Sequence, residues 1–258
     1  MTDLAPAPVP LLVGGVSELF QHDLDLGRLA IERLQAEDLG RGVIVEELHY
    51  GAVAVAQRLE DLRPAALILI SAVRRGRSPG TVERRRLDAP QLAPADVQAA
   101  VGDAVTGYVH PDLVIEVAAA LGALPTRTIT VEVEPAVTGP GEGLSASATA
   151  GLEVALDLVR AEALRAPLLA LAAELRQLVS GDRLEESPAL SALRALLSEL
   201  ARVDRDGRWG HTFVLRDQLR RGIAQSPSSE GMDHRDWGLW WTLIEELDRL
   251  QAVEAVPS

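Results

Sequence analysis

The chain has 258 residues, and its hydrophobic and charged fractions, 47% and 24%, are typical of a packed soluble protein. The net charge of −13 and the aromatic fraction of 3% argue against general nucleic-acid binding, because phosphates are repelled and bases find few stacking platforms. The absence of cysteine excludes disulfides and thiolate sites, and no apolar run reaches the roughly 18–20 residues of a membrane span, so we expect a cytoplasmic protein.

The first 165 or so residues alternate between short apolar runs, typical of strands, and segments with apolar residues at helical spacing. Strands are expected at Val9–Val16, Val43–Val45, Ala65–Ile70, Thr81–Leu87 and Arg127–Val133. Helices are expected at Asp25–Ala36, Gly51–Leu62, Pro111–Leu121 and Leu152–Leu164. This alternation predicts an α/β fold, a three-layer α/β/α sandwich around a mostly parallel sheet.

After Pro167 the pattern becomes entirely helical. We expect helices at Leu168–Val179, Pro188–Val203, Thr212–Ala224 and Trp237–Val253. The sequence therefore predicts an α/β domain over residues 1–166 and a helical region over residues 167–258. All four tryptophans lie in the helical region, and three of them fall within five residues. Either some are exposed at an interface or they cap a small helical core.

In a doubly wound fold the crevice lies at the carboxyl ends of the strands. The polar residues expected there are His22, Asp23, Asp25, Glu47, His49 and His110. Two interpretations remain open, a metal site built from some of them or ordinary polar residues lining a loop-rich crevice. Asp23 also suits the positive end of a helix dipole, and His110 stands just before a proline at the start of a helix.

Four pieces of sequence have a recognisable order. Leu12–Gly27 combines a strand, glycines and Asp23 ahead of a helix that contains Gly27. The strand Ala65–Ile70 is followed by a loop that closes in Ser78-Pro79-Gly80-Thr81, His110 stands six residues before Glu116, and Thr130–Pro135 reads TVEVEP. In this order and spacing, residues 10–165 resemble the hydrogenase maturation endopeptidase family.

The resemblance implies a nickel-dependent protease that removes a C-terminal extension from the large subunit of nickel-iron hydrogenase. The family is thought to recognise the nickel of its substrate through two carboxylates and a histidine. In this chain the two carboxylate positions fall on Leu24 and Ser71, and only His110 remains as a metal ligand. A replacement site would have to draw on Asp23 or Asp25 as catalytic groups, with Glu47 and His49 nearby.

Arg74, Arg75 and Arg77 form a basic cluster in the loop after the third strand, on a chain that is acidic overall. They are either a solvated loop or a binding surface for an acidic partner or peptide.

Three functional hypotheses follow. The first is a maturation protease that acts on the large-subunit precursor. The second is a catalytically inactive relative that binds a hydrogenase large subunit or an assembly factor as a chaperone or scaffold. The third is an unrelated α/β protein that binds a small molecule.

Overall fold

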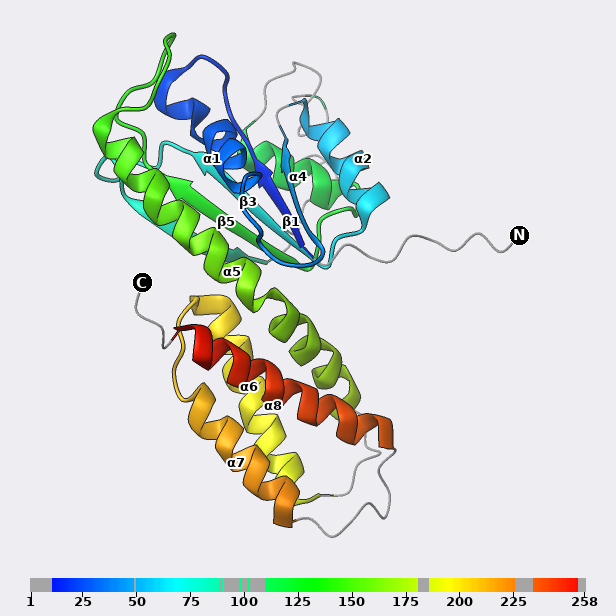
Figure 1. Ribbon diagram of the computed structural model, residues 1–258. Helices are drawn as coiled ribbons and strands as arrows, with labels where there is room; N and C mark the ends of the chain where they lie inside the picture. Colours follow the sequence, from blue (N-terminus) through cyan, green and yellow to red (C-terminus); the bar gives the residue numbers. More distant parts are fainter. Residues whose placement is uncertain are drawn as a thin grey trace. The chain divides into compact units, whose positions relative to one another are not determined.

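The computed structural model describes residues 11–48, 50–88, 90, 98, 102, 110–180, 186–225 and 234–254, without the side chains of 234–237 and 254. The chain divides into two compact units, Met1–Ala163 and Leu164–Ser258, called here the α/β unit and the helical unit. Each is described by itself (Figure 1).

The α/β unit is built on a five-stranded sheet with the order β2-β1-β3-β5-β4. Its strands are β1 (Leu11–Gly15), β2 (Val43–Glu47), β3 (Ala66–Ala72), β4 (Val82–Leu87) and β5 (Arg127–Val133). The first four strands in the sheet order pair in parallel, whereas β4 pairs antiparallel with β5 at the edge. The mostly parallel sheet predicted from the sequence is confirmed.

Helices cover both faces of this sheet. They are α1 (Leu26–Leu34), preceded by the 3-10 turn η1 (His22–Asp25), α2 (Ala52–Leu62), α4 (Pro111–Ala120) and α5 (Ala146–Val179). Figure 1 shows α1 and α5 on one face, with α2 and α4 on the other. The predicted three-layer α/β/α sandwich is therefore also confirmed.

The central layer follows from local sequence. All seven residues of β3 are buried, as a strand covered on both faces requires. Gly15 permits close packing of α1, because a Cβ at this position would overlap the carbonyl oxygen of Gly27 and the side chain of Ile31. The buried side chains of β1, β3, α2 and α4 form one apolar cluster on the second face.

One predicted boundary is wrong. The sequence placed a helix end before Pro167, but α5 continues through this residue from Ala146 to Val179. Proline lacks a backbone N–H, so the carbonyl of Ala163, four residues earlier, receives no helical hydrogen bond from it. The division between the two units falls directly after Ala163.

The helical unit contains the end of α5, α6 (Pro188–Asp206), α7 (Thr212–Gln225) and α8 (His234–Glu254). Its interior is a cluster of leucines together with Trp240, which is 2% exposed. Trp241 is 43% exposed, so neighbouring tryptophans do face different environments. None of the described helices is long and apolar enough to cross a membrane.

Candidate functional site

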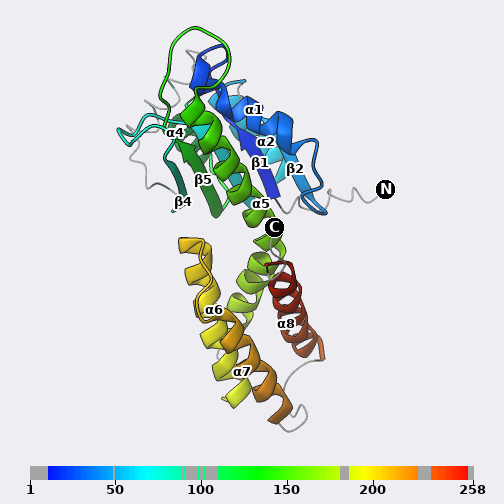
Figure 2. The ribbon, with the colours of Figure 1, turned by 60° about the vertical axis from the view of Figure 1, so that its left-hand side comes forward.

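The carboxyl ends of β1, β3 and β5 meet at one edge of the sheet because these strands are parallel. Three loops leave the sheet there, at residues 16–21, 73–81 and 134–145, and Figure 2 shows the first and the last of them beyond the same end of the strands. This edge carries most of the residues that the sequence singled out. It holds two separate groups of buried charge.

The first group is built on Asp23, whose side chain is completely buried. Its Oδ2 atom accepts hydrogen bonds from the backbone N–H of Ala136 (2.8 Å), the N–H of Val137 (2.8 Å) and the hydroxyl of Ser145 (2.8 Å), and its Oδ1 atom accepts the N–H of Ser145 (2.6 Å). Burial raises the pKa of Asp23, but these hydrogen bonds outweigh burial and hold it below its ordinary value. The carboxylate thus anchors a loop that comes more than one hundred residues later in the sequence.

Asp25 takes part in a different interaction. Its carboxylate accepts hydrogen bonds from Nε and Nη2 of Arg28, the shortest at 2.6 Å. Asp25 is 7% exposed and makes no side-chain cap to α1. The negative charge of Glu47, at the end of β2, contributes to raising the pKa of Arg28 after the larger contribution of Asp25. The structure therefore brings Asp25 and Glu47 near one cation, whereas His49 lies outside the described residues.

The three positions that hold metal ligands in the resembling family are poorly suited to that purpose. Leu24 is apolar and half-buried, and Ser71 is 1% exposed with no hydrogen-bond partner for its hydroxyl within the described residues. A neutral serine hydroxyl is a weak metal ligand, and leucine offers no donor atom. These side chains do not fit a nickel ion.

His110 is the N-cap of α4. Its Nδ1 atom accepts the backbone N–H of Asp112 at 3.3 Å, and Pro111 occupies the first helical position. Among the described residues, no group of three histidine, aspartate or glutamate side chains could hold a metal ion.

The second group of buried charge is centred on Glu132 of β5, which is fully buried. Arg75 donates to both of its oxygens, from Nη2 at 2.8 Å and from Nε at 3.0 Å, and Arg85 donates from Nη2 at 2.5 Å. Arg77 lies within ion-pair range at 3.7 Å. Burial raises the pKa of Glu132, but the guanidinium groups of Arg75 and Arg85 outweigh it and keep the pKa below its ordinary value.

Arg75 links this group to two more carboxylates. Its guanidinium makes a two-point contact with Asp112 at 2.7 and 2.8 Å, which lowers the pKa of Asp112 and helps to raise that of Arg75. The backbone N–H groups of Arg75 and Gly76 donate to Glu134 at 2.9 and 3.1 Å. The loop after β3 is therefore tied to β5 and to the start of α4.

The basic loop predicted from the sequence consequently has two kinds of arginine. Arg74 is exposed, whereas Arg75 and Arg77 are half-buried and paired with carboxylates of the same chain. Sequence reasoning missed Glu132 and Glu134. In the sequence, polar residues alternate with apolar ones along this strand and so mark one of its faces. That all seven residues of the strand are buried is known only from the fold.

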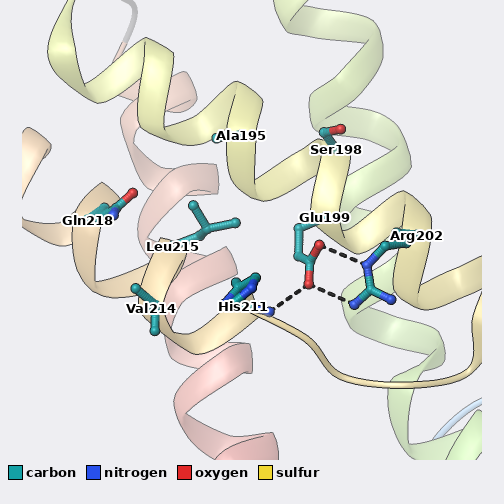
Figure 3. Close-up of a pocket in the computed structure, with 8 residues that line it drawn as sticks. All are labelled: Ala195, Ser198, Glu199, Arg202, His211, Val214, Leu215 and Gln218. Atoms are coloured by element: carbon teal, nitrogen blue, oxygen red, sulfur yellow. Dashed lines mark hydrogen bonds and ion pairs between the residues drawn. The ribbon is translucent and has the colours of Figure 1, made fainter.

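The helical unit contains a cavity of about 560 Å³ between α6 and α7 (Figure 3). Its lining residues are Ala195, Ser198, Glu199, Arg202, His211, Val214, Leu215 and Gln218. Glu199 accepts hydrogen bonds from Arg202 at 2.8 Å and from the backbone N–H of His211 at 2.8 Å, so its carboxylate is already engaged. The one carboxylate of the lining is therefore held in structural contacts and is not free to act as a general base.

Solved structures of hydrogenase maturation endopeptidases are similar to this chain. HybD from E. coli is 26% identical, with 60% of this chain and 92% of that chain covered and a TM-score of 0.44. A hydrogenase 2 maturation peptidase from a Thaumarchaeota archaeon is 23% identical (58% and 95% covered, TM-score 0.43). The NiFe hydrogenase maturation protease HycI from Thermococcus kodakarensis is 17% identical (61% and 94% covered, TM-score 0.43). No protein-family model and no curated protein matches the chain.

Proposed function

We propose that this protein is a hydrogenase maturation protease-like protein that binds the precursor of a nickel-iron hydrogenase large subunit without cleaving it. The observation that carries the proposal is the state of the three ligand positions. Leu24 and Ser71 supply no carboxylate, and His110 uses Nδ1 to cap a helix. A protease that depends on two carboxylates and a histidine would lack its metal-recognising groups.

The catalytic candidates among the remaining carboxylates also have structural partners. Asp23 is saturated by four hydrogen bonds, and Asp25 is paired with Arg28. A carboxylate held in this way is a poor general base, because proton transfer would break the interactions that stabilise its charged form. These contacts favour a role in shaping the crevice edge over a role in hydrolysis.

The test is to mix the protein with a nickel-loaded large-subunit precursor that carries its C-terminal extension. We expect the two to co-elute from a sizing column, with the intact mass of the precursor unchanged. Loss of the extension, abolished by His110→Ala, would overturn the non-cleaving proposal. A precursor that neither binds nor shortens would overturn the assignment to hydrogenase maturation.

A gain-of-function variant sharpens the experiment. Leu24→Glu combined with Ser71→Asp places carboxylates at the two positions where the family has them. Equilibrium dialysis should detect nickel binding by this double variant and none by the unchanged protein. Equal nickel binding by both would show that other side chains hold the metal. His110→Ala in the double variant is the matched control and should remove the binding.

A further inference from the structure

Hydrogen bonds join two loops at the crevice edge, residues 18–22 and 136–145, which are together called here the loop clamp. The backbone N–H of Gly141 donates to the carbonyl of Phe20 at 2.8 Å, and the N–H of His22 donates to the carbonyl of Gly141 at 3.1 Å. The four hydrogen bonds to Asp23 secure the same pair of loops. Figures 1 and 2 show the two loops side by side beyond the sheet.

Two non-glycine residues of the loop clamp have an unfavourable backbone conformation. Phe20 has φ of 58° and His22 has φ of 48°, both in the left-handed region that non-glycine residues rarely adopt. Gly141 has φ of 154°, and a Cβ there would overlap the ring of His22. Such strain persists only where surrounding contacts enforce it, and it is often associated with a functional surface.

The strained segment presents apolar side chains to solvent. Phe20 is 64% exposed, the largest value for any large hydrophobic side chain in the part of the chain that the structure describes. Leu19 beside it is 39% exposed, and Val137 on the partner loop is 45% exposed. Exposure of an aromatic ring is unfavourable in water, and aromatic anchors that become buried supply much of the energy of protein interfaces.

The residues of the loop clamp that carry formal charge are acidic. The loop clamp and Asp23 contain three acidic residues, Glu18, Asp23 and Glu142, and no arginine. Asp23 is buried, but Glu142 is exposed at the tip of the second loop. The nearest arginine in sequence, Arg28, is already paired with Asp25. An apolar surface with an exposed carboxylate beside it, that of Glu142, complements an apolar segment that carries positive charge.

We propose that Leu19, Phe20 and Val137 form a docking surface for a segment of the large-subunit precursor in which an apolar side chain is flanked by arginine or lysine. This inference rests on the proposed function for the identity of the partner. The hydrogen bonds of the loop clamp fix the surface before binding, so little conformational entropy is lost when the partner docks.

The first experiment uses two labelled peptides with the same central Leu-Phe-Leu, flanked by arginine in one and by glutamate in the other. Fluorescence anisotropy should show at least about tenfold tighter binding of the arginine-flanked peptide, reduced by added salt. Phe20→Gly should weaken that binding by about tenfold, since it removes the aromatic anchor. Equal binding of both peptides, no binding of either, or insensitivity to Phe20→Gly would overturn the docking surface.

Phe20→Gly separates binding from folding, because glycine adopts positive φ without strain. The variant should therefore keep the thermal stability of the unchanged protein while it loses affinity. Leu121→Ala is the matched control, since it removes a 53% exposed apolar side chain from the end of α4. Glu142→Gln should weaken binding of the arginine-flanked peptide by about two- to threefold, as expected for one exposed charge.

The precursor then distinguishes the two proposals. If it co-elutes equally well with the unchanged protein and with Phe20→Gly, the docking surface is wrong and the proposed function stands. If it co-elutes with neither, while the arginine-flanked peptide binds through Phe20, the proposed function is wrong and the docking surface stands.

Discussion

The two units of the chain achieve burial in different ways. The α/β unit encloses charged side chains, among them Asp23, Glu132 and Glu162, and each carboxylate is met by backbone N–H groups or guanidinium groups. The described core of the helical unit is mainly aliphatic, and Arg216 is its one buried charged residue. Ionic contacts depend on direction and exact pairing, whereas aliphatic packing depends mostly on volume. The α/β unit should therefore tolerate conservative substitution less well.

Among the conservative substitutions, the largest expected effect comes from Glu132→Gln. The change keeps the size of the side chain but removes the charge on which Arg75, Arg77 and Arg85 converge. Breaking a buried ion pair from one side should lower the free energy of unfolding by about 3 kcal/mol. Urea denaturation followed by far-UV circular dichroism measures it.

Glu83→Gln is the control for Glu132→Gln, because Glu83 is a half-exposed partner of Arg77 and should cost less than about 1 kcal/mol. Tryptophan fluorescence should remain unchanged in both variants at low urea, since all four tryptophans belong to the helical unit. A loss below about 1 kcal/mol for Glu132→Gln would remove the contrast between the units.

Asp23→Asn should have the next largest effect, about 2 kcal/mol, because hydrogen bonds to a charged acceptor are lost. The pKa of Asp23 is lower in the folded chain than its ordinary value of 3.8. Its stabilisation is therefore complete above that value and is lost as the pH falls through the folded-state pKa.

Unfolding measured between neutral pH and about pH 3 tests this sign. The stability of the unchanged protein should fall with acidification, and that of Asp23→Asn should fall less. Hydrogen exchange should rise in residues 136–145 of the variant, because the loop clamp has lost its anchor. Identical pH dependence in both proteins would contradict the assigned role of Asp23.

In the helical unit, a conservative change should cost little. Leu247 is fully buried in the apolar cluster, and Leu247→Met nearly conserves volume, so we expect a loss of less than about 1.5 kcal/mol. Leu247→Ala, which leaves a cavity, should lower the free energy of unfolding by about 2–5 kcal/mol and is the reference for this comparison. Tryptophan fluorescence reads this unit directly. If Leu247→Met costs as much as Glu132→Gln, the two units do not differ in the way described here.

The smallest effect on stability is expected for Phe20→Gly. Relief of left-handed backbone strain and the greater flexibility of glycine in the unfolded chain oppose each other, so the net change should stay within about 1 kcal/mol. Differential scanning calorimetry measures it. A larger loss would mean that the Phe20 side chain supports the fold, and its exposure would then need another explanation.

Local sequence predicted much of the secondary structure. Arg127–Val133 is a strand with the predicted bounds, and Pro188 and Thr212 begin helices as expected. The position of His110 before Pro111 predicted a helix start, which the structure confirms. These features depend on residues close together in the chain, such as a cap, a proline or a run of apolar residues.

The partners of the candidate residues could not be predicted in the same way. Asp23 looked like a residue at a helix start, but its carboxylate binds a loop more than one hundred positions later. Arg75 looked like part of a basic surface, but it pairs with Glu132 and Asp112. A sequence shows which side chains are charged, yet their pairing depends on which strand ends meet.

By itself, the sequence determined the order of strands and helices, the class of the fold, and the absence of carboxylates at Leu24 and Ser71. Only the tertiary structure decided that β4 pairs antiparallel with β5, that α5 continues through Pro167, and that Glu132 collects three arginines. The physical reason is range. Helix caps and apolar periodicity act within a few residues, whereas burial and ion pairing depend on groups that only the folded chain brings together.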